Sequence, residues 1–204
     1  MDTGISTYAA EYLAEVRTLL DRFPRAQLER VTGELLAAHG RGSRIYIMGN
    51  GGSAATASHF ACDLAKGCSV DGRPGFRVSS LTDAVPTLTA IANDLAYEEI
   101  FREQLRTLLE PSDVVVAISA SGNSPNVLRA LEYGRSCGAV TIGFLGFDGG
   151  KAKDLVDACI LINSFDYGHV EHVHSMVTHL IAQYLAQHLR RSPSAGNRTR
   201  PQRS

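Results

Sequence analysis

The apolar positions of this chain alternate between two periods, one typical of buried strands and one typical of amphipathic helices. Short runs rich in β-branched and other apolar residues predict strands over 44–48, 76–81, 113–119, 140–145 and 159–163. Such runs are typical of parallel strands that are covered on both faces. Because helical stretches separate them, we expect an α/β fold: a three-layer α/β/α sandwich around a five-stranded parallel sheet.

Apolar residues spaced three and four apart predict the helices. Two of these helices, over 5–23 and 25–38, come before the first strand, with Pro24 between them. Their apolar faces either pack on the chain's own sheet or form an oligomer contact, and the pattern does not separate the two. The remaining helices are expected from residue 53 onward and over 85–92, 97–109, 126–137 and 167–191.

A glycine-rich turn follows the first strand. Asn50, Gly51 and Gly52 allow the backbone to take positive φ angles and to approach a ligand closely, and Ser53 is the predicted N-cap of the next helix. The free N–H groups and the dipole at a helix start favour a phosphate group. The turn lacks the GxxxxGK[ST] spacing of a P-loop and the GxGxxG spacing of a dinucleotide site. An ordinary strand-to-helix turn is the alternative interpretation.

The strand over 113–119 repeats this design with hydroxyl groups. It leads into SASGNS, where Ser119, Ser121 and Ser124 can meet one phosphate together with backbone N–H groups. Ligands of open parallel sheets bind at the carboxyl ends of the strands, where both turns are expected. Two such turns in one domain favour a phosphate site over two unrelated turns.

Several residues with metal-binding or acid–base side chains lie on two of the predicted helices. His59 and Asp63 are one turn apart and point the same way, as a functional pair or as a surface pair. The last helix carries a cluster of such residues: His169, Glu171, His172, His174 and His179. His172 aligns better with His179 than Glu171 does, because seven residues nearly complete two helical turns.

Composition limits the class of protein. The chain has 204 residues, 44% of them hydrophobic, and a net charge of −1, which fits one sizeable domain over 1–191 followed by a basic, disordered tail over 192–204. The charge balance argues against nucleic-acid or membrane-surface partners, and no apolar run is long enough to span a membrane.

The cysteines and the N-terminus indicate the cellular compartment of the protein. The N-terminus is acidic and amphipathic, unlike a signal peptide. The four cysteines have no CxxC spacing, and Cys62 and Cys159 lie in segments that we expect to be buried. Reduced thiols in a cytoplasmic protein are the expectation.

Three motifs, GNGGSAATASHFACDL, LTAIANDLAYEEIF and AISASGNSPNVLRAL, resemble the sugar isomerase (SIS) domain and, within it, the phosphoheptose isomerases. The resemblance covers about residues 5 to 190. It implies an aldose–ketose isomerase that converts sedoheptulose 7-phosphate to D-glycero-D-heptose 7-phosphate. It also implies a homotetramer with active sites between subunits.

The resemblance also implies roles for individual residues. The phosphate would be held by Ser119, Ser121 and Ser124 with help from Ser53 and the turn Asn50, Gly51 and Gly52, and Asn93 and Asp94 would contact the sugar. Zinc would be bound by His59, Asp63, Glu171 and His179, with Asp63 as base and His179 as acid.

The sequence departs from the family pattern at several of these positions. Asp63 stands where the family has glutamate, Glu171 where it usually has glutamine, and Ala120 where it has threonine. Gly168 and His169 replace an Asp-Arg-like pair near the sugar.

The chemistry that the resemblance implies sets clear requirements. An enediol mechanism needs a base, a group that protonates or polarises the carbonyl oxygen, and a phosphate anchor. Zinc can polarise the carbonyl and bind both enediol oxygens. The alternative functions are a non-catalytic SIS tetramer that binds a protein partner, as in replication-initiation regulators, and a sugar-phosphate-sensing module.

Overall fold

The sheet of this protein has five strands, all parallel, as the sequence predicts. A computed structural model describes residues 4–191, so the tail predicted at 192–204 lies outside the described residues. The strand order is β2-β1-β3-β4-β5. The strands are β1 (Arg44–Gly49), β2 (Arg77–Ser80), β3 (Val114–Ser119), β4 (Val140–Gly146) and β5 (Ala158–Ile162).

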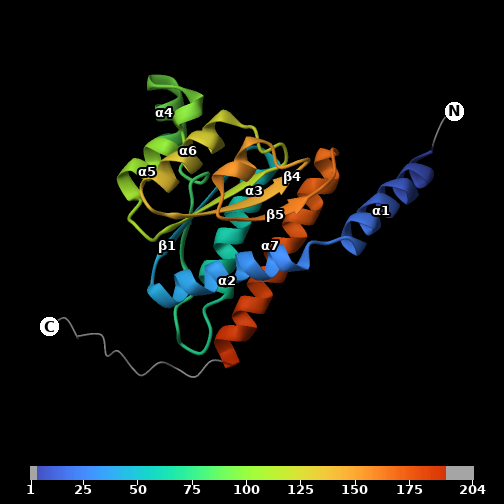
Figure 1. Ribbon diagram of the computed structural model, residues 1–204, viewed down its shortest axis with the longest axis horizontal. Helices are drawn as coiled ribbons and strands as arrows, with labels where there is room; N and C mark the ends of the chain where they lie inside the picture. The colour runs from blue at the N-terminus through green and yellow to red at the C-terminus, as the bar shows by residue number, and fades with distance from the viewer. Residues whose placement is uncertain (1–3, 192–204) are drawn as a thin grey trace.

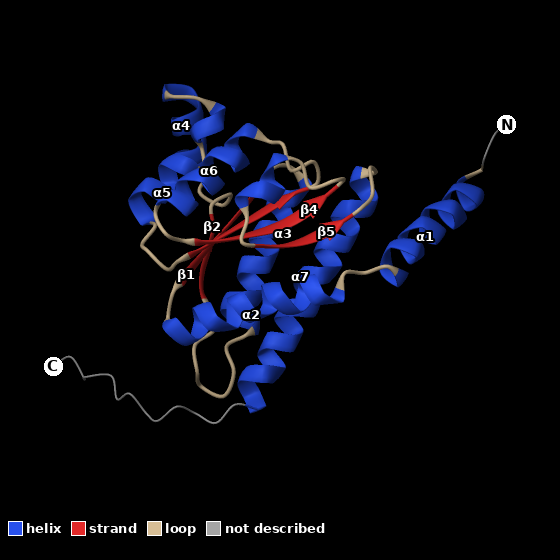
Figure 2. Cartoon of the chain, in the orientation of Figure 1, coloured by secondary structure: helices blue, strands red, loops and turns tan. Residues whose placement is uncertain are grey.

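Helices cover both faces of the sheet and make the predicted three layers (Figures 1 and 2). One layer contains α2 (Arg25–Arg41), α3 (Gly52–Cys62) and α7 (Tyr167–Arg191), and the other contains α5 (Arg102–Leu108) and α6 (Pro125–Ser136). Successive strand residues point to opposite faces. Ile45 and Ile47 of β1 therefore join the core under α2, α3 and α7, while Tyr46 and Met48 join the core on the other side.

Helix α1 (Ile5–Asp21) extends away from the body and buries none of its residues (Figure 1). It is attached near the start of α7, where the hydroxyl of Tyr12 lies 2.8 Å from Nδ1 of His172. Its apolar residues Ile5 and Leu13 are 81% and 65% exposed. Leu19 near the end of α1 packs against the core, but most of the apolar face of α1 is not covered by the described residues.

Two local predictions are wrong. The helix expected over 97–109 is a 3₁₀ turn at Tyr97–Glu99 followed by α5. Helix α3, predicted from residue 53 onward, continues into a π-helical segment, Asp63–Gly67. Cys62 is exposed and Cys159 is half-buried, whereas Cys68 is the buried thiol, because Cys62 ends α3 on its outer side. All four cysteines are free.

Helix α4 (Val85–Asp94) stands on the rim of the domain, above α5 and α6 in Figure 1, and buries none of its residues. Among the described residues, no helix has the length and apolar character to cross a membrane.

Candidate functional site

The turn after β1 presents free backbone N–H groups, as predicted, but its cap differs from the prediction. Gly51, with φ of 55°, is the N-cap residue, and α3 begins at Gly52, so Ser53 lies in the first turn of the helix. No side chain caps α3. The first N–H groups of the helix therefore remain available to an anion.

The side chain of Asn50 is fixed by two residues that sequence reasoning did not single out. Its Nδ2 donates to Oδ1 of Asn126 at 2.9 Å, and its Oδ1 accepts from the hydroxyl of Tyr97 at 3.0 Å. Both partners belong to the motifs quoted above, and their place in those motifs is the signal that could have found them. They hold the glycine turn against the turn that follows β3.

The turn after β3 is organised by its own serines. Oγ of Ser119 accepts from the N–H of Gly122 at 3.0 Å, and Oγ of Ser121 accepts from the N–H of Asn123 at 3.3 Å. Ser124 is the N-cap residue of α6. The hydroxyl hydrogens of Ser119 and Ser121 thus remain free to donate to a ligand.

A single cavity of about 120 Å³ joins the two turns. Its lining includes Asn50, Ser53, Ser119, Ser121, Ser124, Tyr167 and Glu171. The prediction that the two turns meet at one edge of the sheet is therefore confirmed. The described residues around this cavity include no lysine, arginine or histidine.

Asn93 and Asp94 lie elsewhere. They end α4, and Nδ2 of Asn93 donates to Oδ1 of Asp94 at 2.8 Å. Neither residue lines the serine cavity of its own chain. Their predicted contact with the sugar stays a prediction.

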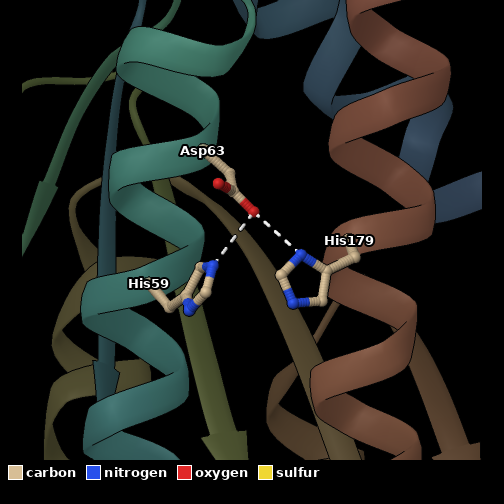
Figure 3. Close-up of side chains that lie close together, drawn as sticks. All are labelled: His59, Asp63 and His179. Carbon is tan, nitrogen blue, oxygen red and sulfur yellow. Dashed lines mark ion pairs between the residues drawn. The ribbon is translucent and has the colours of Figure 1, made fainter.

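A second group of polar side chains lies between α3 and α7. Oδ2 of Asp63 lies 3.1 Å from Nδ1 of His179 and 3.5 Å from Nε2 of His59 (Figure 3). The two imidazole rings are perpendicular, with centroids 4.6 Å apart. One ligand atom from each residue can be chosen so that all lie within 4.8 Å of one another.

The backbone around Asp63 fixes its position relative to α7. Asp63 opens the π-helical segment, in which its carbonyl accepts from the N–H of Cys68 at 3.0 Å. Such segments are frequent at functional sites. The carbonyl of the next residue, Leu64, accepts from the N–H of Phe76 at 3.1 Å. A Cβ on Gly75 would meet the carbonyl of Leu64 at 2.6 Å, so only glycine allows this approach.

The thiol of Cys68 ties the same segment to α7. It donates to the carbonyl of Ala182 at 3.5 Å, one turn after His179. Burial, with the carboxylate of Asp63 as a second cause, raises the pKa of Cys68 to about 11. The thiol therefore keeps its proton at neutral pH and contributes to the fixed spacing between Asp63 and His179.

The donors of this group fit a zinc ion. Two imidazole nitrogens and one carboxylate oxygen form a His₂/carboxylate set of the kind that catalytic zinc sites use, with a position left for water or substrate. The side chains of His59, Asp63 and His179 are 56%, 27% and 44% exposed, so a ligand can reach them. Among the residues described, these three form the only such cluster.

Glu171 does not join this group. It precedes His179 by eight residues, about 12 Å along the axis of α7. Its carboxylate instead reaches the start of α3, where a Cβ on Gly52 would lie 2.9 Å from Glu171 Cδ. Of the four predicted metal ligands, three thus lie together between two helices, and only Glu171 lies at the sheet edge.

The other histidines of α7 have separate surroundings. His172 contacts Tyr12 of α1, and the ring of His169 lies 4.3 Å from that of Tyr12. His174 is fully buried, and its Nε2 lies 3.1 Å from the carbonyl of Leu145. None of them joins the group around Asp63, so the alternative of His172 as a ligand is not supported by the geometry.

The hydrogen bond of His174 assigns its tautomer. A carbonyl only accepts, so Nε2 carries the hydrogen, and Nδ1 is buried without a partner among the described residues. Burial lowers the pKa of His174 to about 4, because protonation would place an unpaired N–H and a charge in the core. His174 is therefore a neutral core residue that joins α7 to β4.

Comparisons with known proteins agree on one family. Residues 11–146 match the SIS domain family. A phosphoheptose isomerase of Syntrophotalea carbinolica is 37% identical over 87% of this chain and 92% of its own length. One of Trichlorobacter lovleyi is 43% identical over 72% of this chain and 75% of its own length.

Solved structures of the same description have the same fold. The phosphoheptose isomerase of Neisseria gonorrhoeae superposes with a TM-score of 0.82 at 26% identity, over 90% of this chain and 99% of that one.

Proposed function

This chain belongs to the SIS domain family and, within it, to the phosphoheptose isomerases, and from that premise we propose that it interconverts sedoheptulose 7-phosphate and D-glycero-D-heptose 7-phosphate. The reaction moves one proton between neighbouring carbons through an enediol. The observation that supports it most is the presence, in one chain, of a serine-lined cavity and a His/Asp/His group.

The spacing of these two sites suits a phosphorylated sugar. Ser53 and His59 are six residues apart on α3, which corresponds to about 9 Å along the helix axis. An open-chain sugar can therefore place its phosphate among the serines while its carbonyl end approaches His59 and Asp63. The phosphate would receive hydrogen bonds from Ser119, Ser121 and Ser124.

In Asp63 and His179, one polar atom of each side chain faces the other residue, and the second polar atom is available to the substrate. Oδ2 of Asp63 and Nδ1 of His179 face each other, which leaves Oδ1 of Asp63 and Nε2 of His179 for the substrate. Oδ1 takes the proton from the carbon beside the carbonyl and returns it to the former carbonyl carbon, while the imidazole gives a proton to the carbonyl oxygen and takes one from the neighbouring hydroxyl. Zinc, held by His59, Asp63 and His179, would polarise that carbonyl and stabilise the enediol oxygens.

The assembly that we propose is a homotetramer with active sites between subunits. Helix α1 exposes Ile5, Tyr8 and Leu13, and no part of the described chain covers them. A neighbouring subunit would also bring its α4, with Asn93 and Asp94, toward the substrate. We place the protein in the cytoplasm, with its four cysteines as free thiols. Light scattering checks the assembly: a monomer at micromolar concentration would contradict it.

A coupled assay tests the activity. The purified protein is incubated with ketose phosphates of five to seven carbons, with zinc and after removal of metal. We expect turnover of the seven-carbon substrate only in the presence of metal, and none with the variant His179→Ala. Absence of turnover with every substrate would refute the proposal and favour a regulator that binds a protein partner.

A further inference from the structure

The side chains of Asn50 and Asn126 form a closed pair between the glycine turn and the first turn of α6. Nδ2 of Asn50 donates to Oδ1 of Asn126 at 2.9 Å, and Nδ2 of Asn126 donates to Oδ1 of Asn50 at 2.9 Å. Asn126 is buried, whereas Asn50 is half-buried and lines the serine cavity between the two turns. Both members of the pair belong to the same chain, so the pair needs no neighbouring subunit.

A backbone group determines which atom of each amide is the oxygen. The N–H of Val127 donates to Oδ1 of Asn126 at 2.9 Å. Because a backbone N–H can only donate, the atom of Asn126 that faces it must be the oxygen. The other atom of that amide is then Nδ2, which needs an acceptor, so the atom of Asn50 that it meets is also an oxygen. The orientation of the Asn50 amide therefore follows from the main chain of α6.

The hydroxyl of Tyr97 supports the same orientation from another direction. It donates to Oδ1 of Asn50 at 3.0 Å, beside a second cavity of about 210 Å³ that both residues line. Oδ1 of Asn50 thus accepts two hydrogen bonds, which uses both of its lone pairs. Nδ2 gives one hydrogen to Asn126, and its second hydrogen has no partner among the described residues. Asn50 therefore has a donor, and no free acceptor, left for a ligand.

We propose that Asn126 and Tyr97 are positioning residues, which hold the amide of Asn50 so that its remaining N–H donates to the bound phosphate. This inference rests on the proposed role of the serine cavity as the phosphate anchor. The phosphate of a sugar is mostly dianionic at neutral pH and accepts hydrogen bonds, so an amide turned by 180° would present a carbonyl oxygen that repels it. The turned amide would also set oxygen against oxygen and nitrogen against nitrogen across the pair, which leaves buried polar atoms unsatisfied.

Titration calorimetry with inorganic phosphate, on the full chain loaded with zinc, is the test. Asn50→Ala removes the donor itself, and we expect its affinity for phosphate to fall about tenfold or more. Asn126→Ala releases the amide, and the affinity should fall nearly as far. Tyr97→Phe keeps the ring and loses only the hydroxyl, so the loss should be about fivefold. Tyr184→Phe, on the exposed side of α7, is the matched control and should bind as the parent does.

Double variants show whether the two residues act through Asn50. In the background of Asn50→Ala no amide is left to hold, so adding Asn126→Ala or Tyr97→Phe should change the affinity less than about twofold. A residue that only supports the local fold would weaken binding further in that background. In steady-state kinetics with sedoheptulose 7-phosphate, both single variants should raise KM and leave kcat within about twofold, since the phosphate is not the part of the substrate that reacts.

The inference is overturned if any of the three single variants binds phosphate as tightly as the parent, or if Asn126→Ala or Tyr97→Phe adds its full loss in the background of Asn50→Ala. A parent that binds no phosphate overturns it too, as does a variant that lowers kcat at unchanged KM. If Asn126→Ala fails to fold, Tyr97→Phe gives the answer, because it removes a single oxygen atom. A parent that turns over no ketose phosphate, but whose variants follow this pattern with inorganic phosphate, would refute the proposed function and support this inference.

Discussion

The two ends of the candidate site are built in opposite ways. The proposed anion-binding end consists of two short turns, each continuous in sequence, and most of its donors are backbone N–H groups and serine hydroxyls. The His/Asp/His end consists of three side chains from two helices, and His179 is far from His59 and Asp63 in the sequence.

Because of this difference, we expect the two ends to respond differently to single substitutions. An anion cradle shares its ligand among many donors, so the loss of one weakens binding without abolishing it. A metal site with three protein ligands depends on each of them. The His/Asp/His end should therefore fail completely on single substitutions, and the serine end should fail in steps. The following predictions test that contrast, from the largest expected effect to the smallest.

The largest effect is expected from His59→Ala and His179→Ala. Each removes one of three ligands, so we expect loss of bound zinc and of detectable turnover, while phosphate affinity at the serine cavity persists. Metal analysis of the purified proteins and calorimetry with phosphate measure the two ends separately. Treatment of the parent with a chelator should reproduce this pattern. If both variants bind as much zinc as the parent and isomerise normally, the site is elsewhere.

Substitutions of Asp63 should distinguish its proposed role as a metal ligand from its proposed role as the base. Asp63→Asn keeps the shape but removes the charge that faces His59 and His179, so turnover should be abolished. Asp63→Glu should keep or raise turnover, because it restores the side-chain length that the family resemblance implies. Steady-state rates at saturating zinc and substrate distinguish the two. A Glu variant as inactive as the Asn variant would show that the π-helical segment is matched to the shorter aspartate.

A smaller, graded effect is expected from Ser121→Ala. The variant loses one hydrogen bond to a charged group, which costs about 1.5–3 kcal/mol and corresponds to a rise in KM of roughly 10- to 100-fold. Zinc content should not change. Ser136→Ala, on the exposed end of α6, is the matched control and should behave as the parent. Unchanged kinetics together with unchanged phosphate affinity in Ser121→Ala would remove the serine from the site.

The smallest effect concerns His174, which lies on α7 between the two ends. Its pKa of about 4 in the folded chain is below the ordinary value of 6.5, so the unfolded chain takes up this proton first as the pH falls. The contribution of His174 to the free energy of unfolding is therefore fully present above pH 6.5, and it declines as the pH falls toward 4. The loss attributable to His174 should reach about 2 kcal/mol at pH 5.

Denaturant unfolding at pH 7 and pH 5 measures this term. His174→Leu should show a smaller drop between the two pH values than the parent, whatever its absolute stability. His172→Leu on the exposed side of α7 is the control. An equal drop in His174→Leu and the parent would show that His174 does not supply the pH dependence.

The sequence by itself determined the parallel α/β sandwich and the meeting of the glycine and serine turns at one edge of the sheet. Runs of β-branched residues and the turns that follow them are local signals, and parallel strands necessarily bring those turns to one edge of the sheet. The family resemblance also predicted His59, Asp63 and His179 as metal-binding residues, and the structure brings these three side chains together.

Only the tertiary structure decided how the two ends are separated. Glu171 and His179 share one helix, but eight residues of rise divide them between the serine cavity and the group around Asp63. The side chains that face α3 depend on how α7 packs across the sheet, with His174 bonded to Leu145 and the π-helical segment bonded to Phe76. These contacts join residues distant in sequence, and no local pattern records them.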